Sequence, residues 1–236
     1  MTGKAGAFRG RNCILRRLPQ VQWKRLQPDL ELIRMQRRTS LYEPGRPFDY
    51  VYFPETGVAS IINVLHDGTE TEVATVGYEG IIGMPVFFGA GTTPGRAFWQ
   101  VPGDAFRLKA DLFLRETKTG GALTDSLHRY AQGYFNQLSY TVSCNRNHSI
   151  RQRASRWLLM SADRAGRNQF ELTHEFLSHM LGVRRSGITE LMGALQKARI
   201  LRYSRGVITI LNRKRLEAAA CECYAVARDE FRRLLE

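Results

Sequence analysis

A group of polar and basic residues in the last third of the chain has the composition of a surface that recognises DNA. Two arginines, Arg184 and Arg185, open an amphipathic segment whose polar face continues with Ser186, Thr189 and Glu190. An arginine at the N-terminal end of such a helix can donate two hydrogen bonds to O6 and N7 of guanine in the major groove. These residues therefore predict recognition of duplex DNA. A pair of helices that only packs, with solvated arginines, is the alternative.

The residues around this group predict a helix-turn-helix followed by a hairpin. Thr173 can cap the first helix with its hydroxyl, and Gly182 can end it. The second helix has apolar positions at helical spacing, namely Ile188, Leu191, Met192 and Leu195. Residues 200–211 predict a hairpin that turns near Ser204–Gly206, with Arg202 and Arg205 beside the turn.

Cysteine and histidine residues suggest metal binding, but their spacing does not support it. Cys144 and His148 stand four residues apart, as do Glu175 and His179. These are zinc-ligand types, but nothing in the sequence brings the two pairs together. Four cysteines, Cys13, Cys144, Cys221 and Cys223, lack disulfide or clasp spacing, and the last two fall on different faces of a helix. We expect no metal and no cofactor; a redox role for Cys221 or Cys223 stays open.

Catalytic signatures are missing from the sequence. It contains neither a G-x-S-x-G nucleophile motif nor a P-loop. Glu70 and Glu72 share one face of an expected strand, but paired acids on an outward face are ordinary. We expect no enzyme activity.

The charge of the chain is concentrated at its two ends. The net charge is +13, made up of +8 in residues 1–38, −4 in residues 39–145 and +9 in residues 146–236. A basic C-terminal part beside an acidic middle favours a polyphosphate partner such as DNA. The N-terminus lacks a secretory signal and no apolar run reaches membrane-spanning length, so we expect a cytoplasmic protein without a membrane partner.

The pattern along the chain predicts an α+β protein in three parts. Residues 12–38 are expected to form one or two short helices. Segments 50–54, 57–65, 70–76 and 96–108 predict strands of an antiparallel β-roll. A long helix with one apolar stripe follows, then a helix over 149–163 and the helix-turn-helix. We expect a roll domain at 12–120, a linking helix at 121–146 and a DNA-binding domain at 147–236, with an amphipathic tail from Arg213.

The order of these parts, with HSIRQRASRWLL (148–159) and LTHEFLSHMLGVRRSGITELMGALQKARIL (172–201), resembles the Crp/Fnr family of transcription regulators. The resemblance implies a cyclic-nucleotide-binding type of roll, a winged helix-turn-helix, RNA polymerase as a partner and a palindromic operator. It also implies a homodimer joined along the long helix, through Leu123, Leu127, Tyr130, Tyr134 and Leu138.

The same resemblance assigns roles at the DNA interface. Base-reading positions fall on Arg185, Ser186 and Glu190, and the last two depart from the family pattern, which implies an altered target sequence. Thr173, Arg184, Arg202 and Arg205 are expected to contact phosphates. Whether the protein activates or represses stays open.

The effector residues of the family are only half present. Gly83 fits the ribose-binding pair, but Met84 replaces its glutamate; Arg96 fits the phosphate-binding pair, but Ala97 replaces its hydroxyl. Methionine cannot accept a strong hydrogen bond from a ribose, and alanine cannot donate one to a phosphate. Only Cys13 precedes the roll, so a family-type iron–sulfur cluster is not expected. We expect no control by cyclic AMP. The alternative is a sensor in which a cyclic nucleotide or another anion binds the roll and controls DNA binding.

Overall fold

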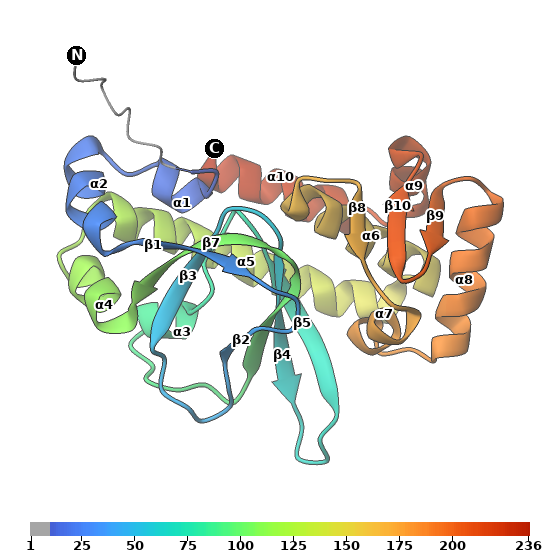
Figure 1. Cartoon of the computed structure of the whole chain (residues 1–236), viewed down its shortest axis with the longest axis horizontal. Helices are drawn as coiled ribbons and strands as arrows, with labels where there is room; N and C mark the ends of the chain where they lie inside the picture. The colour runs from blue at the N-terminus through green and yellow to red at the C-terminus, as the bar shows by residue number, and fades with distance from the viewer. Residues whose placement is uncertain (1–9) are drawn as a thin grey trace.

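The computed structural model describes residues 10–236, and its first half is a roll of two antiparallel sheets (Figure 1). A three-stranded sheet has the order β1-β7-β3, and a four-stranded sheet has the order β2-β6-β4-β5. The bounds are β1 Glu31–Met35, β2 Ser40–Tyr42, β3 Tyr50–Pro54, β4 Val58–Val64, β5 Glu70–Val76, β6 Arg96–Val101 and β7 Gly103–Lys109. The expected α+β class with an antiparallel roll is confirmed.

Two expectations about the roll are wrong in detail. Residues 12–38 are not helical throughout: α1 (Cys13–Arg16), α2 (Gln20–Leu26) and the 3₁₀ turn η1 (Gln27–Asp29) precede strand β1. This strand forms because Leu32 and its neighbours pair in register with β7. The expected strand over 96–108 is two strands that belong to different sheets, and Pro102, which has no N–H to donate, lies between them.

The long helix α5 (Ala122–Asn147) spans the molecule behind the roll. Its first half completes the core of the roll together with the short helices α3 (Met84–Phe87) and α4 (Ala110–Lys118). The C-terminal helix α10 (Cys223–Leu235) runs back along α5 (Figure 1). The Tyr130 ring stacks on Phe231 at 5.8 Å between centroids. Gly133 permits this approach, because a Cβ there would lie 2.8 Å from the Phe231 ring.

The C-terminal part combines helices with a small antiparallel sheet. Its elements are α6 (Ile150–Ala165), β8 (Gln169–Glu171), α7 (His174–Leu181), α8 (Arg185–Lys197), β9 (Leu201–Ser204), β10 (Val207–Ile210) and α9 (Arg213–Ala219). The sheet order is β8-β10-β9. This part shares one apolar core with the outer face of the roll, where Val58, Ile62 and Phe98 pack with Trp157 and Leu177. The amphipathic tail is two helices, α9 and α10, and not one.

The connection between α5 and α6 is short and sharply defined. His148 leaves the helix with an extended backbone, and Ser149 begins α6 with a capping box in which its side chain and that of Gln152 bond each other's backbone N–H. In residues 10–236, no helix is both long enough and apolar enough to cross a membrane.

Candidate nucleic-acid interface

Helices α7 and α8 form the expected helix-turn-helix, and local interactions define its ends. Thr173 accepts a hydrogen bond from the backbone N–H of Phe176, 3.1 Å away, so it caps α7 as expected. Gly182 ends α7 in the left-handed region with a φ of 61°. Helix α8 begins three residues later, at Arg185, with Arg184 as its N-cap.

The polar face of α8 is open to solvent, whereas its apolar face is buried. Ile188 and Met192 are fully buried in the core that the C-terminal part shares with the outer face of the roll. The five residues expected to meet DNA on this helix are all exposed: Arg184, Arg185, Ser186, Thr189 and Glu190. No ion pair within residues 10–236 involves Arg184 or Arg185. Both guanidinium groups are therefore free to bind an anionic partner.

His174 is a residue of this site that the sequence analysis missed. Its Nδ1 lies 3.1 Å from the Thr189 hydroxyl, and its ring stacks on Tyr203 of β9 at 4.3 Å. Thr189 also donates a hydrogen bond to the carbonyl of Arg185. Burial is the larger cause that lowers the pKa of His174, and the positive charge of Arg185 is the smaller one. A neutral His174 thus connects α7, α8 and the hairpin; Tyr203 is 29 residues away, which no local pattern reveals.

The hairpin β9–β10 carries the other basic residues. Its central turn residues, Arg205 and Gly206, have φ values of 50° and 78°. Positive φ at both positions is typical of a type I′ turn, which matches the twist of a two-residue hairpin. The turn lies where the sequence predicts it, and Arg202 and Arg205 are both exposed. The wing thus carries two exposed arginines, and its strand β9 lies beside α8 (Figure 1).

Residues 152–219 match the family model for the Crp-like helix-turn-helix domain. This segment of the chain is therefore a Crp-like helix-turn-helix domain. Its fold is similar to that of FixK2 from Bradyrhizobium japonicum, with a TM-score of 0.67 at 16% identity over 81% of this chain and 98% of that one. The resemblance predicted from the sequence is confirmed.

Two further solved structures have the same fold. The c-di-GMP responsive global regulator CLP from Xanthomonas campestris aligns with a TM-score of 0.63 at 15% identity, over 81% of this chain and 99% of that one. A transcriptional regulator of the CRP family from Thermus thermophilus aligns with a TM-score of 0.63 at 17% identity, over 80% and 96%. The comparison with curated proteins finds no match. The last two of these proteins are regulators.

The roll contains a cavity beside α5, and only some of the expected effector residues line it. The cavity has a volume of about 570 Å³, and Gly83 and Met84 are among its lining residues. Arg96 is not: its guanidinium binds Glu70 at 2.9 Å. Ala97 is buried in the core of the roll. The four residues therefore do not line one cavity, because Arg96 pairs with an acid on β5, the strand beyond β4 in the same sheet. Their role in effector binding stays a prediction.

Three of the five expected dimer residues do not fit a contact with a second copy. Leu123, Leu127 and Tyr130 are buried in the core of their own chain, so they are not available to a partner. Tyr134 and Leu138 are half-buried and line the cavity. The apolar residues that α5 leaves most exposed are instead Phe135, at 67%, and Val142, at 72%. An amphipathic stripe on a helix does not reveal whether its own chain or a second one covers it.

Proposed function

We propose that this protein is a sequence-specific DNA-binding transcription regulator that acts as a homodimer and is not controlled by cyclic AMP. The observation that carries the proposal is the exposed polar face of α8, with Arg185 free of any ion pair in the described chain. Arg185 would read a guanine, while Ser186 and Glu190 would set an operator that differs from the usual family target. Thr173, Arg184, Arg202 and Arg205 would hold phosphates.

The proposed homodimer rests on a second apolar stripe of α5. Ala131, Phe135, Leu138 and Val142 follow one another at intervals of four, three and four residues. This is the spacing of coiled-coil core positions. Two copies paired along this stripe would bury it and present two α8 helices to successive major grooves, about 34 Å apart. A palindromic operator follows from that symmetry, and RNA polymerase is the expected protein partner.

A gel-shift titration with DNA from the region upstream of its own gene tests the DNA-binding proposal. We expect salt-sensitive binding that competitor DNA does not abolish. Arg185→Ala should reduce discrimination at one base pair by ~1–3 kcal/mol, because a two-pronged contact to guanine is lost. Arg115→Ala, at an exposed arginine of α4 in the roll, is the matched control. Unchanged affinity and base preference in Arg185→Ala would refute the assignment of α8.

Sedimentation equilibrium tests the dimer. The double variant Phe135→Ser/Val142→Ser should shift the protein toward monomer, because it removes two apolar side chains from the proposed stripe. Tyr140→Ser, on another face of α5 and 40% exposed, should leave the oligomeric state unchanged. Equal dimerisation of all three proteins would contradict the proposed stripe.

A second candidate function, a sensor of a small apolar ligand, is favoured by the cavity. Apolar side chains such as Ile61, Ile82 and Met84 line most of it, and α5 supplies part of its wall. A ligand there would contact the helix that carries the proposed dimer stripe, which could couple binding to assembly. Thermal-shift measurements distinguish the candidates: cyclic AMP should leave the melting temperature unchanged, whereas a fitting apolar ligand should raise it. Stabilisation by cyclic AMP would overturn that part of the proposal.

A further inference from the structure

Three cysteines and one histidine meet at the junction between the long helix and the C-terminal domain. Cys144 and His148 lie at the end of α5, and Cys221 and Cys223 lie where α9 leads into α10. One ligand atom from each of the four residues lies within 4.8 Å of every other. The sulfur atoms of Cys144 and Cys221 are 3.5 Å apart.

The sequence expectation about these residues is wrong in its geometry. Cys221 precedes α10 and Cys223 is its first residue, so the two thiols do not sit on different faces of one helix. The packing of α10 along α5 then brings them to Cys144, 77 residues earlier in the chain. Glu175 and His179, the other spaced pair, are not members of this cluster.

Two separations in the cluster, Cys144 to Cys221 and Cys223 to His148, are close to those of tetrahedral zinc coordination. With Zn–S bonds of about 2.3 Å and a Zn–N bond of about 2.0–2.1 Å, tetrahedral geometry places two sulfurs about 3.8 Å apart and a sulfur and a nitrogen about 3.6 Å apart. The Sγ of Cys223 lies 3.6 Å from Nδ1 of His148, close to that separation. Ligands this close can share one ion.

The surroundings of the cluster also suit zinc. The three cysteines are buried and form a small cluster of their own, apart from both apolar cores. The other ring nitrogen of His148, Nε2, lies 3.3 Å from the carboxylate of Glu222. A carboxylate in that place keeps the proton on Nε2 and turns Nδ1 toward the metal, as in many zinc sites. The buried Arg156 interacts electrostatically with Cys144 and would offset part of the negative charge of the thiolates.

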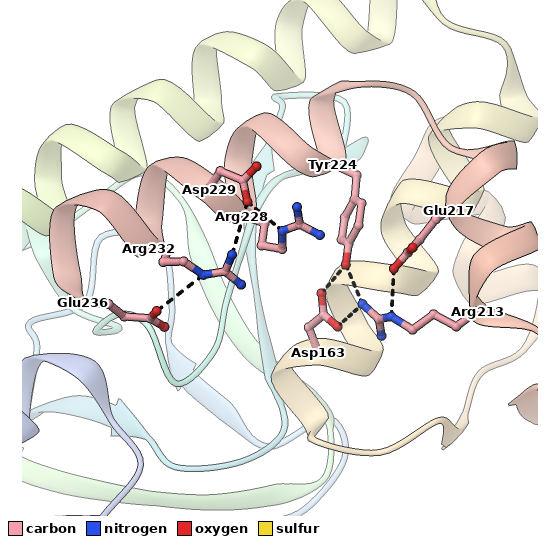
Figure 2. A network of polar contacts seen from close by, with 8 residues as sticks. All are labelled: Asp163, Arg213, Glu217, Tyr224, Arg228, Asp229, Arg232 and Glu236. Atoms are coloured by element: carbon pink, nitrogen blue, oxygen red, sulfur yellow. Dashed lines mark hydrogen bonds and ion pairs between the residues drawn. The ribbon is translucent and has the colours of Figure 1, made fainter.

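A polar network holds the α9–α10 junction in place without help from the cysteines. Figure 2 shows Asp163 of α6, Arg213 of α9 and Tyr224 of α10 in mutual contact. Arg213 donates to the Asp163 carboxylate at 2.6 Å, and the Tyr224 hydroxyl donates to its other oxygen at 2.7 Å. Tyr224 immediately follows Cys223, so this network fixes the segment that carries two of the four ligands.

We propose that Cys144, His148, Cys221 and Cys223 bind one Zn²⁺ as a closed, structural site. Four protein ligands fill the tetrahedral shell and leave no position for a substrate. His148 lies in the short connection between α5 and α6. The ion would therefore link this connection to the start of the C-terminal helix α10. Each thiol that binds gives up its proton to water, so zinc uptake releases up to three protons and weakens as pH falls.

The test uses the full chain, purified under reducing conditions and then dialysed against a chelator to give the metal-free protein. We expect about one zinc ion per chain before dialysis. Titration of the metal-free chain with Co²⁺ should give thiolate-to-cobalt absorption that saturates at one equivalent and that zinc abolishes. Cys144→Ser and Cys221→Ser should each lose this signal. Glu222→Gln should keep it but weaken zinc affinity roughly 10–100-fold, because His148 loses its orienting partner.

Cys13→Ser and His179→Asn are the matched controls, since both residues lie outside the cluster and should leave zinc content and the cobalt spectrum unchanged. Circular dichroism of each metal-free variant shows whether it folds, so that loss of the ion is separable from loss of structure. Zinc retained at one equivalent in folded Cys144→Ser and Cys221→Ser would overturn the assignment. Failure of the reduced wild-type chain to take up zinc or cobalt would overturn the site. A Cys144–Cys221 disulfide that forms when the metal-free chain is exposed to oxygen, which takes up the two electrons, would then show a redox pair instead.

Discussion

Arginine side chains are exposed on the DNA-reading face, but at the contact between the two halves of the molecule they are buried and paired with acids. On α8 and the wing, Arg185 and Arg205 are exposed and have no ion-pair partner in residues 10–236. Between the roll and the C-terminal domain, Arg164 of α6 is 5% exposed and binds Glu79 at 2.7 Å. We call this contact, with Glu72, Glu79, Trp157 and Arg164 at its centre, the domain seam.

This difference separates charges that await a partner from charges that already have one. Arg164 also donates to Thr75 and to Gln137 of α5, so one side chain joins the roll, the long helix and α6. Glu72 of β5 accepts hydrogen bonds from Trp157 and from Ser60. Substitutions in the seam should therefore change stability, whereas substitutions on the reading face should change binding.

The largest effect is expected for Arg164→Met. Methionine replaces the aliphatic part of the Arg164 side chain but leaves Glu79 without its cation. Breaking a buried ion pair lowers the free energy of unfolding by ~3–5 kcal/mol. For a chain of this size that corresponds to a fall in melting temperature of roughly 10 °C. Thermal unfolding followed by circular dichroism measures it, together with DNA affinity at a temperature where the variant is folded, which should stay unchanged.

Two further variants control this measurement. Arg167→Met changes an exposed arginine three residues after Arg164. Its free energy of unfolding should stay within about 0.5 kcal/mol of the wild type. Adding Glu79→Gln to Arg164→Met should recover part of the loss, because the buried charge disappears. If Arg164→Met and Arg167→Met unfold at the same temperature, the seam does not depend on this pair.

The next effect is a pH dependence that Glu72 should produce. Burial raises the pKa of its carboxyl from 4.5 to about 7, despite the hydrogen bonds from Ser60 and Trp157 that lower it. The folded state therefore holds a proton that the unfolded state has lost, so stability should fall as pH rises from about 4.5 to about 7. The full difference, 2.5 pKa units, corresponds to about 3 kcal/mol.

Glu72→Gln should remove this dependence, because its amide still accepts from Trp157 and can donate to Ser60. The variant should match the wild type near pH 4.5 and exceed it in stability above pH 7. Urea unfolding at a series of pH values measures this, with Glu70→Gln, at a partly exposed carboxyl two residues away, as the control. A wild-type pH profile that Glu72→Gln leaves unaltered would assign the dependence to another group.

The comparison also explains how far the sequence could predict this molecule. The helix-turn-helix was predictable because its signals are local: a cap at Thr173, a break at Gly182 and a turn at Arg205–Gly206. The seam was not, since Trp157 and Glu72 are 85 residues apart and neither is unusual in its own segment. The cluster of Cys144 with Cys221 depends on the same long-range packing. The sequence also could not show which residues of α5 are buried by their own chain. Tyr130 and Phe135 are both aromatic, and only the fold shows that Tyr130 is buried and Phe135 exposed.

The smallest effect on stability, with a clear effect on binding, is expected for Arg205→Asn. Asparagine tolerates the positive φ of a type I′ turn, so the wing should keep its shape and stability should change by less than about 0.5 kcal/mol. Removing one phosphate contact should weaken binding to all sequences alike and lower the slope of log affinity against log salt by about 1. Arg38→Asn, an exposed arginine of the roll with a φ of 65°, is the matched control and should leave the salt dependence unaltered. An equal loss of affinity in both variants would mean that Arg205 acts only through net charge, and a change in base preference would make it a reading residue instead.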